Sequence, residues 1–161
     1  MANFSADISM GRETELYRRV LLSDPTNAVL VLVVLASAGL ESDTVLRTYS
    51  TLSSLLAASN NEVTNGYYSR IILDQTDLDP VVVDTGTHRT TLPFLLQTFT
   101  TIGAGDSWRK LIVCYDSDST SGTDATMVPV TFHDILVDGV ALVPNGGNIY
   151  VDGPTGFAIA S

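Results

Sequence analysis

An uninterrupted apolar run constrains this chain more than any other feature of its sequence. Residues 28–36 read AVLVLVVLA, nine consecutive apolar residues rich in valine. A helix that crosses a bilayer needs about 20 such residues, and a secretory signal places its apolar segment directly behind basic residues near the N-terminus. Acidic residues, Glu13, Glu15 and Asp24, are among those that precede this run, which does not fit the pattern of a secretory signal. Because valine favours strands, the run predicts a strand covered on both faces, and no membrane contact.

Length, cysteine content and charge narrow the class of protein further. A chain of 161 residues fits one domain, residues 1–161, which is large enough to bury a hydrophobic core without disulfides or bound metals. The single cysteine, Cys114, excludes an intrachain disulfide framework and a zinc site built mainly from thiolates. With 18 acidic against 8 basic residues the net charge is −10, which argues against nucleic-acid binding. The sequence carries no targeting signal, so we expect production in a cytoplasm, or assembly there into something larger.

The first part of the chain, residues 1–60, predicts a helix, the apolar strand and a second helix. Apolar residues recur at helical spacing over 10–22, and acidic residues stand in the first turn, where they suit the helix dipole. A second amphipathic pattern covers 44–58, with Asp43 as its predicted N-cap. We expect this α/β portion to pack on the remainder of the domain.

From residue 61 onward the pattern is that of a β protein. Short runs rich in Val, Ile, Thr and Phe recur, separated by Gly, Asp, Asn and Pro, and no helical periodicity follows Ala58. The fold class predicted is therefore mainly β, an antiparallel β-sandwich or barrel over about residues 67–161, and not a doubly wound α/β enzyme. The predicted strands span 67–73, 81–83, 89–93, 95–101, 108–115, 127–132, 148–151 and 157–160.

Catalytic signatures are weak. The two histidines are His88 and His133, and a pairing of His133 with Cys114 can be drawn because both fall in neighbouring predicted strands. Cys114 lies within an apolar run, however, where a thiol usually packs as a small inert hydrophobe. No glycine-rich phosphate loop, metalloprotease motif or nucleophile elbow occurs. We expect no enzymatic activity and no cofactor.

One acidic loop could hold a cation. Asp116, Asp118 and Asp124 stand among serines and threonines, and their oxygens are the hard ligands that Ca²⁺ prefers. The spacing departs from an EF-hand, because Gly122 is seventh rather than sixth and Met127 stands where the bidentate acid belongs. Asp, Ser and Gly also build long hairpin connections through Asx and ST turns, so the loop is open to both interpretations.

Aromatic residues at the starts of predicted strands are also open to two interpretations, a sugar-binding surface or part of the core. Trp108 follows a loop at the start of a predicted strand, and Tyr67 and Tyr68 open another. Such rings could stack on sugars, but a single tryptophan at a strand start is more often part of the core.

The C-terminal part of the chain contains the stretch WRKLIVCYDSDSTSGTD over 108–124, followed by VPVTFHD over 128–134. These two stretches resemble a family of small virion proteins of tailed bacteriophages. The segment NGYYSR over 65–70 resembles the entry to that group's first sheet strand, and GFAIAS over 156–161 resembles its C-terminus. Together the resemblance covers about residues 60–161, and its motifs are turn and strand signatures rather than catalytic ones.

The resemblance implies a structural, non-enzymatic virion component, either a capsid decoration (cement) subunit or a minor tail protein. We then expect a homo-oligomer that contacts major capsid or tail proteins and is located in the virion after assembly in the host cytoplasm. The alternative is an adhesion module, a β-sandwich that binds Ca²⁺ or a glycan. Besides the three aspartates of the loop, the residues expected to serve as scaffold or interface are Tyr67, Arg70, Trp108, Tyr115, Thr123, Pro129 and Asp134.

Overall fold

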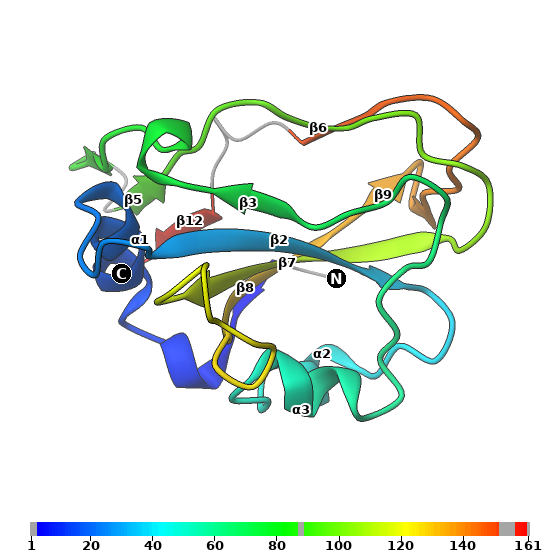
Figure 1. Ribbon diagram of the computed structural model, residues 1–161, viewed down its shortest axis with the longest axis horizontal. Helices are drawn as coiled ribbons and strands as arrows, with labels where there is room; N and C mark the ends of the chain where they lie inside the picture. The colour runs from blue at the N-terminus through cyan, green and yellow to red at the C-terminus, as the bar shows by residue number, and fades with distance from the viewer. Residues whose placement is uncertain (1–2, 87–88, 152–156, 161) are drawn as a thin grey trace.

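The apolar run forms the central strand of the protein. In the computed structural model, which describes residues 3–86, 89–151 and 157–160, the run is strand β2 (Val29–Ala36), and all eight of its residues are buried. It pairs antiparallel with β3 (Ile71–Leu73) on one side and with β7 (Trp108–Asp116) on the other (Figure 1). The prediction of a strand covered on both faces is confirmed.

Five antiparallel strands make up the main sheet, in the order β1-β8-β7-β2-β3. β8 (Val128–Asp134) lies beside β7, and β1 (Phe4–Ser5) adds a two-residue strand at the outer edge. The register between β7 and β8 shifts where the chain reaches Pro129, which has no N–H to donate to the ladder.

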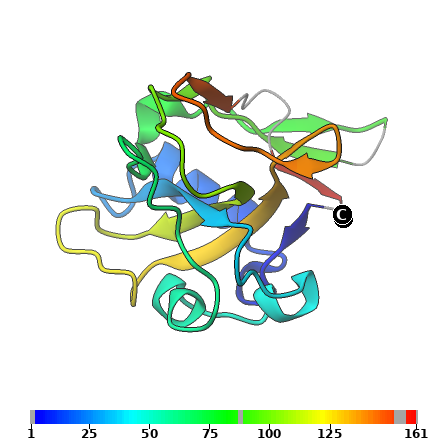
Figure 2. The ribbon, with the colours of Figure 1, turned by 90° about the vertical axis from the view of Figure 1, so that its right-hand side faces the viewer.

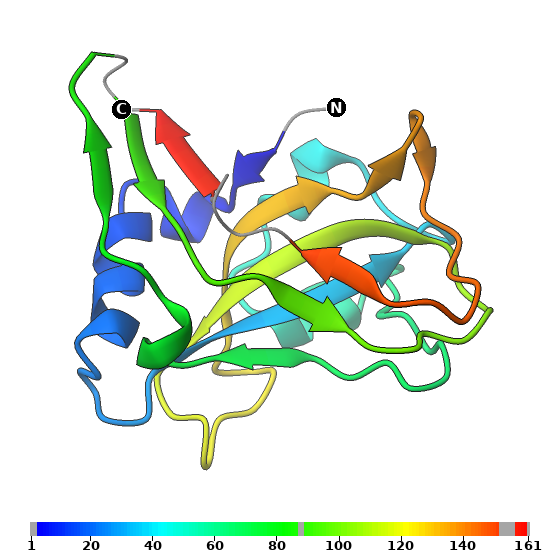
Figure 3. The ribbon, with the colours of Figure 1, turned by 90° about the horizontal axis from the view of Figure 1, so that it is seen from above.

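Shorter elements complete the fold. The described residues also form three small antiparallel sheets (Figure 3). In the first, β5 (Arg89–Leu92) lies between β4 (Val82–Asp84) and β12 (Phe157–Ala160). The second pairs β6 (Gln97–Phe99) with β11 (Ile149–Val151), and the third pairs β9 (Leu136–Val137) with β10 (Val140–Ala141). The α-helices are α1 (Glu13–Leu21), α2 (Asp43–Leu46) and α3 (Leu52–Leu56), and 3₁₀ turns lie at Asp7–Ser9 and Gln75–Asp77. Strand outweighs helix by 34% to 16%, which confirms the predicted mainly β class.

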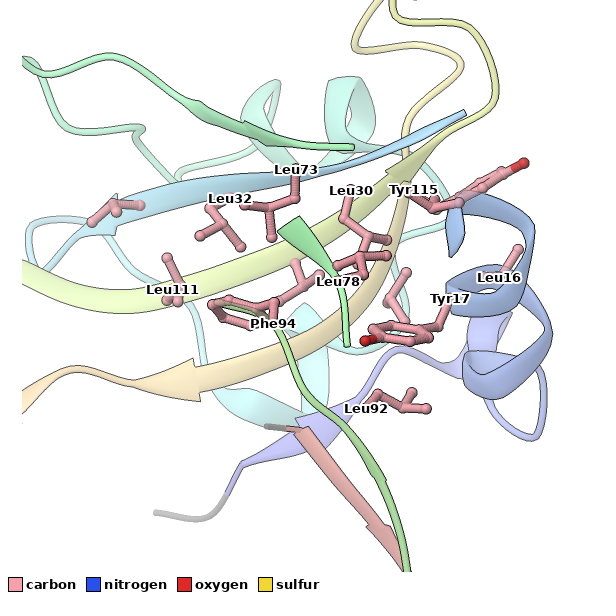
Figure 4. Packing of buried hydrophobic residues seen from close by; sticks show 14 of the residues in the cluster. Leu16, Tyr17, Leu30, Leu32, Leu73, Leu78, Leu92, Phe94, Leu111 and Tyr115 are labelled. Atoms are coloured by element: carbon pink, nitrogen blue, oxygen red, sulfur yellow. The ribbon is translucent and has the colours of Figure 1, made fainter. Parts of the chain in front are cut away.

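The two faces of the main sheet are covered by different layers. On one face Leu30 and Leu32 of β2 pack with Leu16 of α1, and with Leu92 and Phe94 from the segment around β5 (Figure 4). On the opposite face, residues of β2 and β7 meet the apolar side of the two short helices; this cluster includes Val31, Val33, Ile112, Cys114, Leu46, Leu52 and Leu55. The alternation of two clusters along β2 and β7 is the direct consequence of a side-chain period of two.

The predicted long helix over 44–58 is wrong. The segment forms two short helices, α2 and α3, separated by an extended residue, Thr51, at φ −138° and ψ 153°. The Thr51 side chain accepts a hydrogen bond from the N–H of Ser54, and the Thr51 N–H donates one to the Ser54 hydroxyl oxygen. Threonine and serine thus start a new helix where the apolar spacing alone favoured continuation.

The N-terminal portion is integrated into the sheet rather than packed on it. The predicted helix over 10–22 corresponds to α1, but the following strand β2 is the centre of the main sheet. Each of the eight strands predicted after residue 66 overlaps an observed strand, although most of the bounds differ. The two-residue strands β1, β9 and β10 were not predicted, because two residues carry no detectable alternation.

Candidate functional site

The acidic loop between β7 and β8 is organised by Asp118. This carboxylate accepts hydrogen bonds from the Thr120 N–H at 3.1 Å, from Thr120 Oγ1 at 2.6 Å and from Ser121 Oγ at 2.5 Å. The bonds from Ser121 and then Thr120 hold the pKa of Asp118 well below its usual range. Figure 2 shows this loop, drawn in yellow, extending from the end of the two strands. The interpretation of the loop as a set of carboxylate and hydroxyl turns is confirmed.

The other two predicted calcium ligands are engaged elsewhere. Asp116 accepts a hydrogen bond from the Asp118 N–H at 3.1 Å, and Asp124 binds the Arg70 guanidinium. Within residues 3–86, 89–151 and 157–160, no three His, Cys, Asp or Glu side chains gather as a metal site would require. At Asp124 a Ca²⁺ ion would compete with the Arg70 guanidinium for the carboxylate.

Arg70 joins the loop to the body of the protein. Its guanidinium donates to Glu62 Oε1 at 2.8 Å and Oε2 at 2.6 Å, and to Asp124 Oδ1 at 2.5 Å and Oδ2 at 3.0 Å. Hydrogen bonds to Glu62 and Asp124 raise the pKa of Arg70, and Arg70 in turn lowers the pKa of Asp124. Two bidentate pairs on one guanidinium fix the loop geometrically, so Arg70 serves as scaffold. Its partner Glu62 was not predicted.

The remaining scaffold or interface candidates divide by exposure. Trp108, Tyr115 and Pro129 are buried, so they serve the core and not an interface. Tyr67, with 84% of its surface exposed, and the exposed Thr123 are available for contact. Because Trp108 is fully buried, it cannot act as a platform for a sugar, and the alternative core position is confirmed.

Cys114 and His133 do not form a catalytic pair. His133 is the cross-strand partner of Leu111, whose side chain belongs to one face of the main sheet, whereas the Cys114 thiol packs in the cluster on the other face. Burial also raises the pKa of Cys114, which disfavours the nucleophilic thiolate. The second histidine, His88, lies outside the described residues.

The most unusual polar group in the described part of the chain is Lys110, whose side chain is 1% exposed. Its Nζ lies 2.6 Å from Oδ1 of Asp134, the cross-strand neighbour on β8, and 2.9 Å from Oδ1 of Asp43 on α2. The ring of Phe4 covers the ammonium at 5.0 Å. Asp134 was a predicted scaffold residue, but neither its pairing with Lys110 nor the role of Asp43 was predicted.

His133, the residue before Asp134, borders a cavity of about 350 Å³. The cavity is lined mainly by apolar side chains, among them Phe99, Trp108 and Leu111. The His133 Nε2 lies 2.9 Å from Thr131 Oγ1. Burial, and secondarily the Lys110 ammonium, lower the pKa of His133 to about 4.

The lowered pKa predicts an acid-sensitive fold. Unfolded histidine titrates near 6.5, so between about pH 6.5 and pH 4 the unfolded chain binds more protons at His133, and the free energy of unfolding falls as the pH falls. We expect a loss of about 1–2 kcal/mol between pH 7 and pH 5 from this group. Urea unfolding at both pH values should show a smaller loss in His133→Gln than in the wild type. Equal losses in the two proteins would contradict the prediction.

Searches against protein-family models, curated proteins and solved structures gave no match. Within the described ranges, none of the helices has both the length and the apolar character needed to cross a membrane.

Proposed function

We propose that this chain is a non-enzymatic structural component of a tailed-phage virion, a capsid decoration (cement) or minor tail protein. It acts through contacts with copies of itself and with major capsid or tail proteins. The resemblance over residues 60–161 supports the virion setting. The observation that carries the contact-based role is an apolar edge strand, β4.

β4 presents valine to solvent along an open sheet edge. Val82 is 54% exposed and Val83 is 64% exposed, although strand valines usually pack against a neighbouring layer. Among the described residues β4 pairs only with β5, and β12 occupies the far side of β5. The three-stranded sheet lies at one end of the molecule, with β4 on its outside (Figure 3).

An edge of this kind favours addition of a strand from another chain. Monomeric proteins usually protect exposed edges with lysine, proline or a covering segment, and β4 itself, Val82–Asp84, contains neither of these residues. Backbone hydrogen bonds along the edge would supply affinity, and the valines would bury apolar surface in the joint. Subunit contacts of this type suit a protein used in symmetric copies.

The test is to place a positive charge on the edge. Val83→Lys is expected to weaken self-association at least tenfold, because a lysine on an edge strand opposes pairing with another strand. Light scattering after size exclusion measures the association, and mass spectrometry of purified particles measures incorporation into virions. Leu22→Lys is the matched control, since Leu22 is 65% exposed, like Val83, but is the C-cap of α1 and lies outside the three-stranded sheet.

Two outcomes would overturn the proposal. One is a wild-type chain that stays monomeric at all concentrations and is absent from purified particles. The other is equal association of Val83→Lys, Leu22→Lys and the wild type, which would remove the edge as the contact surface.

A further inference from the structure

We propose that Lys110 and Asp134 condense into an intramolecular isopeptide bond between β7 and β8, with Asp43 as the proton carrier. The three side chains come from a strand, its neighbour in the sheet and a helix on the same face. Their arrangement supplies an amine, a carboxyl carbon and a second carboxylate at one buried point.

The charges at this point do not balance. One ammonium, Lys110, faces two carboxylates, and the exposed fractions of the side chains are 1% for Lys110, 8% for Asp134 and 27% for Asp43. Asp134 Oδ2 is buried without a hydrogen-bond partner, and Asp43 Oδ1 lies near Nζ without hydrogen-bond geometry. Buried charges with unmet hydrogen bonds are costly, so a reaction that removes one ion pair and one carboxylate oxygen relieves the site.

The reacting groups are already in place. Lys110 and Asp134 are register partners on adjacent strands, and Nζ lies 2.6 Å from Oδ1, one bond away from the carbon that it would attack. The Phe4 ring, stacked on Phe132 at 4.8 Å between centroids, covers the ammonium and restricts water at this side. Holding two reactants in contact replaces a bimolecular encounter and raises the effective concentration by many orders of magnitude.

The chemistry balances without any further reactant. The Lys110 ammonium passes a proton to Asp134 Oδ1, and the neutral amine attacks Cγ to form a C–N bond. Asp43 takes a proton from the attached nitrogen and delivers it to the hydroxyl at Oδ1, whose C–O bond breaks as water leaves. Asp134 Oδ2 becomes the amide carbonyl oxygen, and Asp43 is again a carboxylate, now able to accept the amide N–H.

The test is the intact mass of the folded wild-type chain, which is expected to be lower than the sequence mass by one water. Lys110→Arg retains the positive charge but is expected to keep the full mass of its own sequence. Asp43→Asn is expected to slow the loss of water about 100-fold, the contribution usual for a positioned proton carrier. A folded wild-type chain with its full sequence mass after prolonged incubation would overturn the proposal.

Dehydration elsewhere must be separated from this bond. The sequence contains Asp138-Gly139 and Asp152-Gly153, and aspartate before glycine can lose water by closing a ring on its own backbone. Proteolysis followed by fragmentation is therefore expected to yield a branched peptide that joins Lys110 to Asp134. A water loss that maps to either Asp-Gly pair, or that persists in Lys110→Arg, would also overturn the proposal.

Discussion

Replacing Trp108 with alanine is expected to lower the free energy of unfolding by about 3–5 kcal/mol. Trp108 is fully buried at the start of β7, and its ring packs edge-on against Phe99 at 5.0 Å and Tyr68 at 5.9 Å between centroids. Its Nε1 donates to Asn65 Oδ1 at 3.0 Å. Truncation therefore leaves both a large cavity and an amide oxygen without its donor. Urea unfolding followed by circular dichroism measures the loss.

Tyr67→Ala is the control for removal of a large aromatic ring. Tyr67 precedes one of the residues that pack on Trp108, yet it is 84% exposed, so its truncation is expected to change stability by about 0.5 kcal/mol or less. A loss in Trp108→Ala no greater than in Tyr67→Ala would show that the tryptophan is not a core residue.

The positions of the strands could be predicted because their signal is local. The valine-rich run of β2 and the strand predicted over 108–115 each extend over eight residues, and both are strands in the structure. Within β7, Leu111 and Cys114 pack in the clusters on opposite faces of the sheet. Local patterns carry such information because a strand's side chains alternate between faces.

What the sequence did not predict depends on contacts between distant segments. Lys110 within an apolar strand gave no sign of its partners, because Asp43 belongs to a helix start and Phe4 to a two-residue strand. The use of Asp124 by Arg70, rather than by a cation, likewise depends on how the loop folds back on the body. Composition identifies groups capable of binding an ion, and only the tertiary arrangement decides which partner they have.

Replacing Lys110 with methionine is expected to lower the free energy of unfolding by about 3–5 kcal/mol. Methionine fills much of the volume of the lysine stem, so the cost arises mainly from charge. In the variant, Asp134 and Asp43 lose the cation that lies 2.6 Å and 2.9 Å from them in the wild type. A loss of stability is expected whether Lys110 and Asp134 form an ion pair or an amide in the wild type, because in the variant both Asp134 and Asp43 are carboxylates without the lysine. Chemical unfolding at pH 7 gives the measurement.

The control is a second substitution, Asp134→Asn, whose effect on the free energy of unfolding is expected to have opposite signs in two backgrounds. With Lys110 retained, Asp134→Asn takes away the carboxylate that lies 2.6 Å from the buried lysine and is expected to destabilise the fold. In the Lys110→Met background the same change removes an uncompensated buried charge, and we expect it to restore about 1 kcal/mol or more. Such a reversal shows that the fold tolerates the buried carboxylate of Asp134 because Lys110 is present. If Asp134→Asn destabilised both backgrounds equally, packing rather than charge would account for the loss.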